Sequence, residues 1–74
     1  MIAIQGYKES KDSVFLIFDN EGIHEMIDYL NFIKDKDSSM HLSKGNELSS
    51  DTEEVEDDMY LITHVKLINI DKLE

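Results

Sequence analysis

The sequence predicts an α+β fold with the order β-β-α-β-β, in which one helix packs on one face of a largely antiparallel sheet of three to four strands. Short β-prone apolar segments stand on both sides of a single segment whose apolar residues have helical spacing. The length of 74 residues allows one small domain, which we expect to span residues 1–74. Cysteine is absent, so the fold has no disulfide and relies on its apolar core or on an oligomer interface.

The first two expected strands form a hairpin. Ile2–Tyr7 (IAIQGY) is β-prone, residues 8–12 (KESKD) supply a polar turn, and residues 13–19 (SVFLIFD) form a continuous apolar run. One helix covers only one face of a sheet, so we expect a dimer partner, a bound protein or a folded-back loop to cover the other. Side chains alternate between the two faces of a strand, which places Val14, Leu16 and Phe18 on one face and Phe15 and Ile17 on the other.

The helix is expected over residues 21–34, directly after the N-cap candidates Asp19 and Asn20. Glu21 places a negative charge in the first turn, where the helix dipole favours it, and Lys34 complements the dipole near the other end. Five apolar residues at helical spacing are predicted to pack on the sheet: Ile23, Met26, Ile27, Leu30 and Ile33.

Two further strands are expected at residues 38–43 (SSMHLS) and 59–70 (MYLITHVKLINI), separated by an acidic loop at about residues 44–58. The last segment is rich in β-branched residues and alternates as a half-buried strand does. Ile68 and Ile70 fall on the opposite phase, which predicts a bulge or a switch of the buried face in its second half.

Acidic residues dominate the charge, since 17 Asp and Glu face seven Lys and no Arg, and the formal net charge is −10. Phosphate contacts need clustered Lys or Arg, so nucleic acid is not an expected partner, and neither is an anionic membrane. A basic protein is the partner that this charge favours. No apolar run approaches the roughly 20 residues that span a bilayer. The start MIAIQGYKES lacks the pattern of a signal peptide, so we expect a cytoplasmic protein.

Residues 47–58 (ELSSDTEEVEDD) hold seven carboxylates and no Lys or Arg. Like charge of this density is expected to stay solvated. Three interpretations remain open: a surface that contacts a basic partner, a merely solvated loop, or a cation site. An EF-hand calcium loop has a glycine at its sharp turn, but no glycine lies between Asn46 and Asp58. The candidate partner-binding carboxylates are Asp51, Glu53, Glu54, Glu56, Asp57 and Asp58.

Two aromatic residues of the expected helix, Phe32 and Tyr29, are further candidates for contact with a partner. At about 100° per residue, Phe32 falls about 180° from Ile23 when Ile23 is taken as the centre of the buried stripe. It lies among Glu25 and Asp28, with Tyr29 on the flank. An exposed aromatic ring among acids suits an anchor for a partner, although single exposed apolar side chains are ordinary.

Patterns for catalysis or metal binding are weak. The histidines His24, His41 and His64 are spread over the expected helix and two strands, and a surface histidine in a sheet is more often structural than a ligand. The chain has no cysteine nucleophile, no Gly-x-Ser-x-Gly motif and no phosphate-binding glycine loop. We therefore expect neither an enzyme nor a cofactor.

Several segments resemble a known family in their order: the opening IAIQGY, DNEGIHEMIDYL (19–30), MHL (40–42), GNEL (45–48) and the terminal strand. This layout resembles the immunity protein 32 family, small α+β proteins found beside toxins in bacterial polymorphic toxin systems. The resemblance implies that the chain neutralises a cognate toxin by tight, non-covalent binding. The long acidic run and the extended last strand depart from that family.

Three functions are consistent with these observations. The first is an inhibitor of a toxin or another basic protein, including a phage or mobile-element inhibitor of a host nuclease. A run of carboxylates can enter the basic groove of a nuclease as phosphate does. The second is a homodimeric accessory protein whose second sheet face is its interface. A small enzyme or metal-binding protein is the least favoured.

Overall fold

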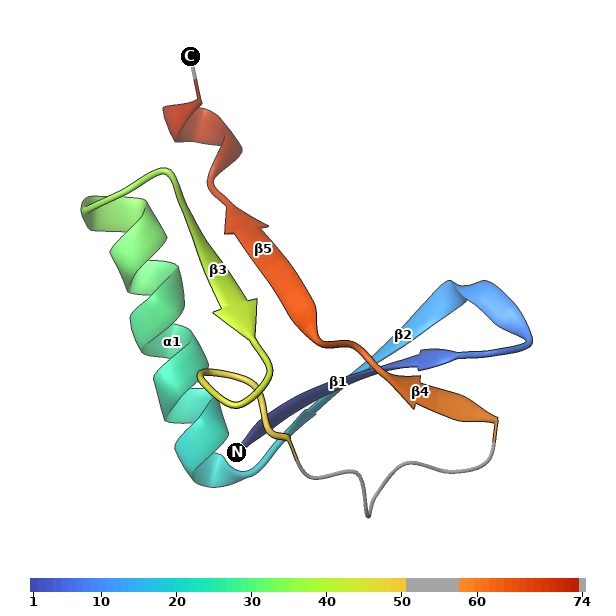
Figure 1. Ribbon diagram of the computed structural model, residues 1–74. Coiled ribbons are helices and arrows are strands. Elements are labelled where there is room, and N and C mark those ends of the chain that lie inside the picture. The colour runs from blue at the N-terminus through green and yellow to red at the C-terminus, as the bar shows by residue number, and fades with distance from the viewer. Residues whose placement is uncertain (51–57, 74) are drawn as a thin grey trace.

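The computed structural model describes residues 1–50 and 58–73 of the chain. These residues form an α+β fold in the predicted order, with a strand hairpin, one helix and then further strands (Figure 1). The elements are β1 (Ile2–Tyr7), β2 (Ser10–Phe18), α1 (Asn20–Asp35), β3 (Ser39–Ser43), β4 (Met59–Leu61), β5 (His64–Ile68) and the short 3₁₀ helix η1 (Ile70–Lys72).

The described strands form two antiparallel sheets instead of the single predicted one. β1 lies between β2 and β4 in a three-stranded sheet, and β3 pairs with β5 in a two-stranded sheet. Figure 1 shows α1 running beside the β3–β5 pair, while the β1–β2 turn points away from the helix. The fold is correspondingly elongated and thin, with principal extents of 40 × 26 × 17 Å.

The second sheet arises because the predicted last strand, residues 59–70, divides in two. β4 pairs with β1 and β5 pairs with β3, and the two residues between them bond to both sheets. The Ile62 N–H donates to the Ile4 carbonyl (2.8 Å), and the Thr63 carbonyl accepts from the Lys44 N–H (2.8 Å). The chain therefore changes sheets at Ile62 and Thr63, a division that the predicted bulge or switch of the buried face near Ile68 and Ile70 does not describe.

The apolar core is centred on four side chains from β1, β3 and the loop after β3: Ile2, Ile4, Leu42 and Leu48. Seven half-buried residues pack around them: Phe18, Met26, Tyr29, Met40, Ile62, Val65 and Leu67. β1, β2, α1, β3 and β5 thus contribute to this cluster or border it, as does Ile62 between β4 and β5. β1 is the most enclosed strand, because it has a neighbouring strand on each side and Ile2 through Gly6 are all buried.

The helix begins one residue earlier than predicted and ends one residue later, but a different face of it is buried. Gly22 and Ile33 are buried, and Met26 and Tyr29 pack against the core, at spacings of four, three and four residues. The prediction that Ile23, Ile27 and Leu30 pack on the sheet is wrong, since these side chains are 46%, 49% and 48% exposed.

The position of Gly22 gives the physical reason for this rotation. A Cβ atom at Gly22 would overlap the carbonyl oxygen of Met1, so only glycine lets the start of β1 run this close to the helix. Asp19 is the N-cap, as one of the two predicted candidates, and its Oδ1 accepts from the Gly22 N–H at 2.7 Å. The same carboxylate pairs with the Met1 amine. These contacts place Gly22 on the inner side of the helix, and the next residue, Ile23, consequently lies on the outer side.

β2 is an edge strand with apolar side chains exposed on both faces. Val14 and Leu16 are exposed on the face that also carries Phe18, and Phe15 is exposed on the other. The strand begins at Ser10, ahead of the predicted start, because the turn needs only Lys8 and Glu9. The sequence predicts that the helix leaves one face of this strand without a cover. In the structure, part of the other face is exposed as well.

Candidate functional site

Four carboxylates lie along one side of α1, and we call them the acidic flank: Glu21, Glu25, Asp28 and Asp35. Their spacings of four, three and seven residues return to the same side of a helix that turns about 100° per residue. Phe32 falls within this series, four residues after Asp28. The acidic side chains of the helix therefore gather on one side of its buried face.

Phe32 occupies the position that the sequence predicts for a partner contact. Its side chain is 41% exposed, and it lines a shallow depression with Asp28 and Asp35. Asn31 and Lys36 complete the depression. None of the acidic flank forms an ion pair with another of the described residues. An apolar ring thus stands at the surface beside carboxylates that form no ion pair within the described fold, with Lys36 lining the same depression.

Tyr29, the second predicted contact, faces inward instead of standing at the surface. Its half-buried side chain packs against the core cluster. Burial raises the pKa of the Tyr29 hydroxyl, and the nearby carboxylates of Glu25 and Glu47 raise it further. Tyr29 therefore stays uncharged at neutral pH. Its position near both carboxylates shows that a loop acid lies close to this part of the helix.

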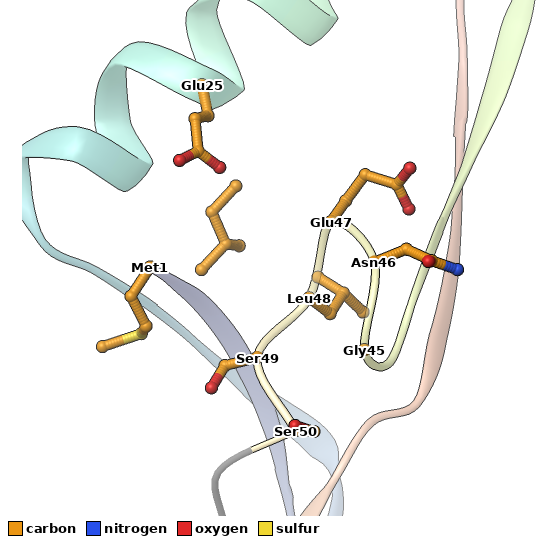
Figure 2. A pocket seen from close by; sticks show the side chains of 9 residues that line it. Met1, Glu25, Gly45, Asn46, Glu47, Leu48, Ser49 and Ser50 are labelled. Atoms are coloured by element: carbon orange, nitrogen blue, oxygen red, sulfur yellow. The ribbon is translucent and has the colours of Figure 1, made fainter.

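A hollow next to this region is bounded by the start of β1, the helix and the loop of residues 45–50 (Figure 2). Glu25 reaches toward it from α1, while Glu47 stands on the loop across from it. The loop is held in place locally, since Glu47 Oε1 accepts from the Ser43 N–H (3.1 Å) and Gly45 adopts a φ of +82° that suits glycine. The hollow therefore lies between one member of the acidic flank, Glu25, and the loop that carries Glu47.

The predicted acidic loop lies mostly outside the described residues: this applies to Asp51, Glu53, Glu54, Glu56 and Asp57. Asp58 is described and exposed, and its backbone carbonyl accepts from the Lys8 N–H at 2.8 Å. Its charge is the largest cause that raises the pKa of Tyr7. Asp58 therefore lies beside the β1–β2 turn, which Figure 1 shows on the side of the fold away from α1. The structure does not bring Asp58 together with Phe32.

Two histidines that are far apart in the sequence meet on the β3–β5 sheet. His41 Nδ1 lies 2.7 Å from His64 Nε2, and the two rings stack with centroids 4.8 Å apart. His24 is exposed on the helix. Within residues 1–50 and 58–73, no three His, Cys, Asp or Glu side chains converge as metal ligands. The same residues contain no helix that is long and apolar enough to cross a membrane.

The sequence contains a signal for the acidic flank, because its four acids recur at helical spacing around Phe32. The approach of Glu47 to Tyr29 has no such signal, because it depends on how the loop after β3 folds back. No protein-family model matches the chain, and no curated protein or solved structure matches it significantly. The candidate site is therefore described by its own geometry alone.

Proposed function

We propose that the chain is a small acidic binding protein that inhibits a basic protein, such as a toxin or a nuclease, by non-covalent association in the cytoplasm. The observation that carries this proposal is the exposed ring of Phe32 among the unpaired carboxylates of the acidic flank. Immunity proteins act in this way, and the resemblance noted above supports that role. A phage or mobile-element inhibitor of a host nuclease would use the same chemistry.

The two components of this surface act at different stages of binding. The net charge of −10 and the acidic flank attract a basic partner over distances of about a Debye length, roughly 8 Å at 0.15 M salt, and raise the association rate. An aromatic ring that becomes buried in a partner's pocket supplies affinity and slows dissociation. Phe32 beside Asp28 and Asp35 combines both effects on one surface.

The test is a kinetic comparison of variants against the basic protein that the chain inhibits. Asp28→Asn with Asp35→Asn should slow association at low salt and leave dissociation nearly unchanged. Phe32→Ala should accelerate dissociation about tenfold or more, as the loss of a central aromatic anchor does. Leu30→Ala is the matched control, because Leu30 is similarly exposed (48%, against 41% for Phe32) but lies on the other side of the helix. Unchanged association and dissociation rates in all three variants would show that α1 is not part of the interface.

A second candidate function, a homodimeric accessory protein, is favoured by the apolar stripe of Ile23, Ile27 and Leu30. On the helical wheel, the neighbours of this stripe on its exposed side are Asn20, His24, Asn31 and Lys34, and no acid lies among them. Two copies that each carry a net charge of −10 repel one another, so a self-contact needs a surface free of acids. The apolar stripe meets that condition, and the acidic flank does not.

Salt separates the two candidates. A dimer through the apolar stripe should strengthen as salt rises, because salt screens the repulsion between the two acidic chains. A complex with a basic partner should weaken under the same change. Light scattering across salt concentrations measures the first, with Ile27→Gln as the disrupting variant and Phe32→Gln as its control. A monomer at high micromolar concentration and high salt would contradict the dimer.

A further inference from the structure

His41 and His64 form a pair of imidazoles that the proposed binding function does not use. His41 lies in β3 and His64 at the start of β5, and both side chains are exposed. In the antiparallel register His41 pairs with Lys66, and Ser43 pairs with His64, so the two histidines are diagonal neighbours on one face of the sheet. Their ring nitrogens Nδ1 and Nε2 approach to 2.7 Å.

The backbone beneath the pair is well supported. On the opposite face of the same two strands, Leu42 is fully buried, and Val65 packs against the core cluster. The Lys44 N–H bonds to the Thr63 carbonyl directly beside Ser43 and His64. The Cα positions of both histidines are thereby held by a buried sheet face, while their exposed rings contact one another at the surface.

We propose that His41 and His64 together bind one divalent transition-metal ion of the Cu²⁺ or Ni²⁺ type on the outer face of the β3–β5 sheet. Imidazole nitrogens lie about 2.0–2.1 Å from Zn²⁺, a divalent ion of the same transition row, and we use this distance for Cu²⁺ and Ni²⁺. Two nitrogens at that distance are about 2.9 Å apart when they subtend about 90° at the metal, and about 3.3 Å apart in a tetrahedral site. The 2.7 Å of the metal-free pair is a hydrogen-bond distance and is already near the spacing of the first arrangement, which Cu²⁺ and Ni²⁺ prefer.

The proton balance of this binding is simple. In the metal-free pair one of the two facing nitrogens carries the shared hydrogen, and that ring moves its proton to its other nitrogen when the metal takes its place. Two neutral imidazoles therefore release no proton, and an imidazolium releases one. Water fills the other coordination positions. Lys66 is the cation on the same face, so it weakens binding, whereas the net charge of −10 draws cations to the protein.

Nickel titration of the intact chain tests the proposal, with Ca²⁺ in excess to occupy carboxylates. Calorimetry should show one equivalent of Ni²⁺ that Ca²⁺ does not displace, because hard cations prefer oxygen ligands and imidazole suits Ni²⁺. His41→Gln and His64→Gln should each weaken Ni²⁺ binding by about tenfold or more, because the loss of a residue that merely hydrogen-bonds a metal ligand already has an effect of that size. His24→Gln is the matched control and should bind as the wild type does. Lys66→Gln should bind more tightly.

A second measurement needs no variant. Paramagnetic Ni²⁺ or Cu²⁺ at substoichiometric amounts should broaden the ring resonances of His41 and His64 before those of His24. Cu²⁺ should bind more tightly than Ni²⁺, and Ni²⁺ more tightly than Co²⁺, as their general order of affinity requires. Equal broadening of all three histidines, displacement of Ni²⁺ by Ca²⁺, or wild-type affinity in His41→Gln and His64→Gln would overturn the proposal. None of these results bears on the acidic flank, so the proposed binding function is tested separately.

Discussion

Tyr60 of β4 lies over Gly6, its register partner in β1. A Cβ atom at Gly6 would collide with the Tyr60 ring and would lie 2.8 Å from its Cε1, so the ring occupies the space that any other residue would fill. An aromatic side chain that covers a glycine on the neighbouring strand compensates for the missing side chain. The pair thus links the centre of the three-stranded sheet to its short strand β4.

Gly6→Ala should destabilise the fold by about 1 kcal/mol, because the new methyl group displaces the Tyr60 ring from its cross-strand contact. In a Tyr60→Ala background the same change should be neutral or stabilising by roughly 0.5–1 kcal/mol, because alanine costs less backbone entropy than glycine in a strand. Urea unfolding of the four proteins measures this difference. Equal costs of Gly6→Ala in both backgrounds would show that Tyr60 is not the obstacle.

Gly22→Ala should destabilise the fold by about 1–3 kcal/mol, although alanine is the better helix former by roughly 1 kcal/mol. The obstacle here is the backbone carbonyl of Met1, which stands where the new methyl group would go, and backbone yields less readily than an exposed side chain. His24→Ala, at an exposed position two residues later, is the control and should be neutral or slightly stabilising. A stabilised Gly22→Ala variant would mean that β1 does not start against the helix.

Leu42→Ala and Leu30→Ala should differ strongly in their effect on stability. Leu42 is 0% exposed in the core cluster, so its truncation should cost about 2–5 kcal/mol. Leu30 is 48% exposed, and its truncation should cost less than about 1 kcal/mol in a monomer. The comparison requires dilute protein, where self-association is absent. A large, concentration-dependent cost for Leu30→Ala would instead indicate burial between two copies.

Replacing Asp19 should alter how stability depends on pH. Its pKa is lowered below the ordinary 3.8, chiefly by the hydrogen bond from the Met1 amine and then by the Gly22 N–H. The stabilisation is therefore present above about pH 4 and is lost as pH falls through the lowered pKa. The pKa of the Met1 amine is raised above 8.0, mainly by Asp19, so the ion pair is also lost as pH rises through this raised pKa.

Wild type and Asp19→Asn should consequently differ most between these two limits and converge at low pH, whereas at high pH only the contribution of the Met1 amine is lost and that of the Gly22 N–H bond remains. Denaturant midpoints measured across the pH range test this expectation. Asp12→Asn is a suitable control, since Asp12 is exposed in β2 and faces no comparable partner in the described fold. A constant difference between wild type and Asp19→Asn at every pH would show that the charge of Asp19 does not contribute.

The acidic loop should act through long-range attraction. Converting its six carboxylates to amides should slow association with a basic partner at low salt and leave the rate at high salt almost unchanged, because salt screens these charges. Stopped-flow mixing at two salt concentrations measures both rates, with the Asp28→Asn, Asp35→Asn variant as the comparison for the helix surface. Equal rates at low salt would assign no binding role to the six residues, which are Asp51, Glu53, Glu54, Glu56, Asp57 and Asp58.

Local patterns predicted the elements of this fold well and their contacts less well. The helix and its cap follow from residues adjacent in sequence, so the prediction of residues 21–34 is off by one residue at each end. The buried face depends on Gly22, whose role arises from the approach of Met1, a residue distant in sequence. Hydrophobicity alone ranks Ile23, the next residue, above a glycine and so selects the wrong face.

The candidate site was likewise predicted in part. Phe32 is exposed, but the prediction that placed it opposite a buried Ile23 is wrong, because Ile23 is itself 46% exposed. Tyr29 turns inward because its ring fills space beside the core cluster. The meeting of His41 and His64 depends on the register of β3 and β5. That register was not visible in the sequence, because the apolar alternation of residues 59–70 continues through the point where the chain changes sheets.

The division of one apolar stretch between two sheets also determines how the molecule opens. β4 and β5 are joined by only Ile62 and Thr63, and each of these is itself hydrogen-bonded, the first to β1 and the second to the segment after β3. Loss of either sheet therefore pulls directly on the backbone of the other, and neither can detach as a separate subglobal unit. We therefore expect the amide hydrogens of Ile62 and Lys44, which are donated to the two sides of this junction, to exchange with solvent through a shared opening event.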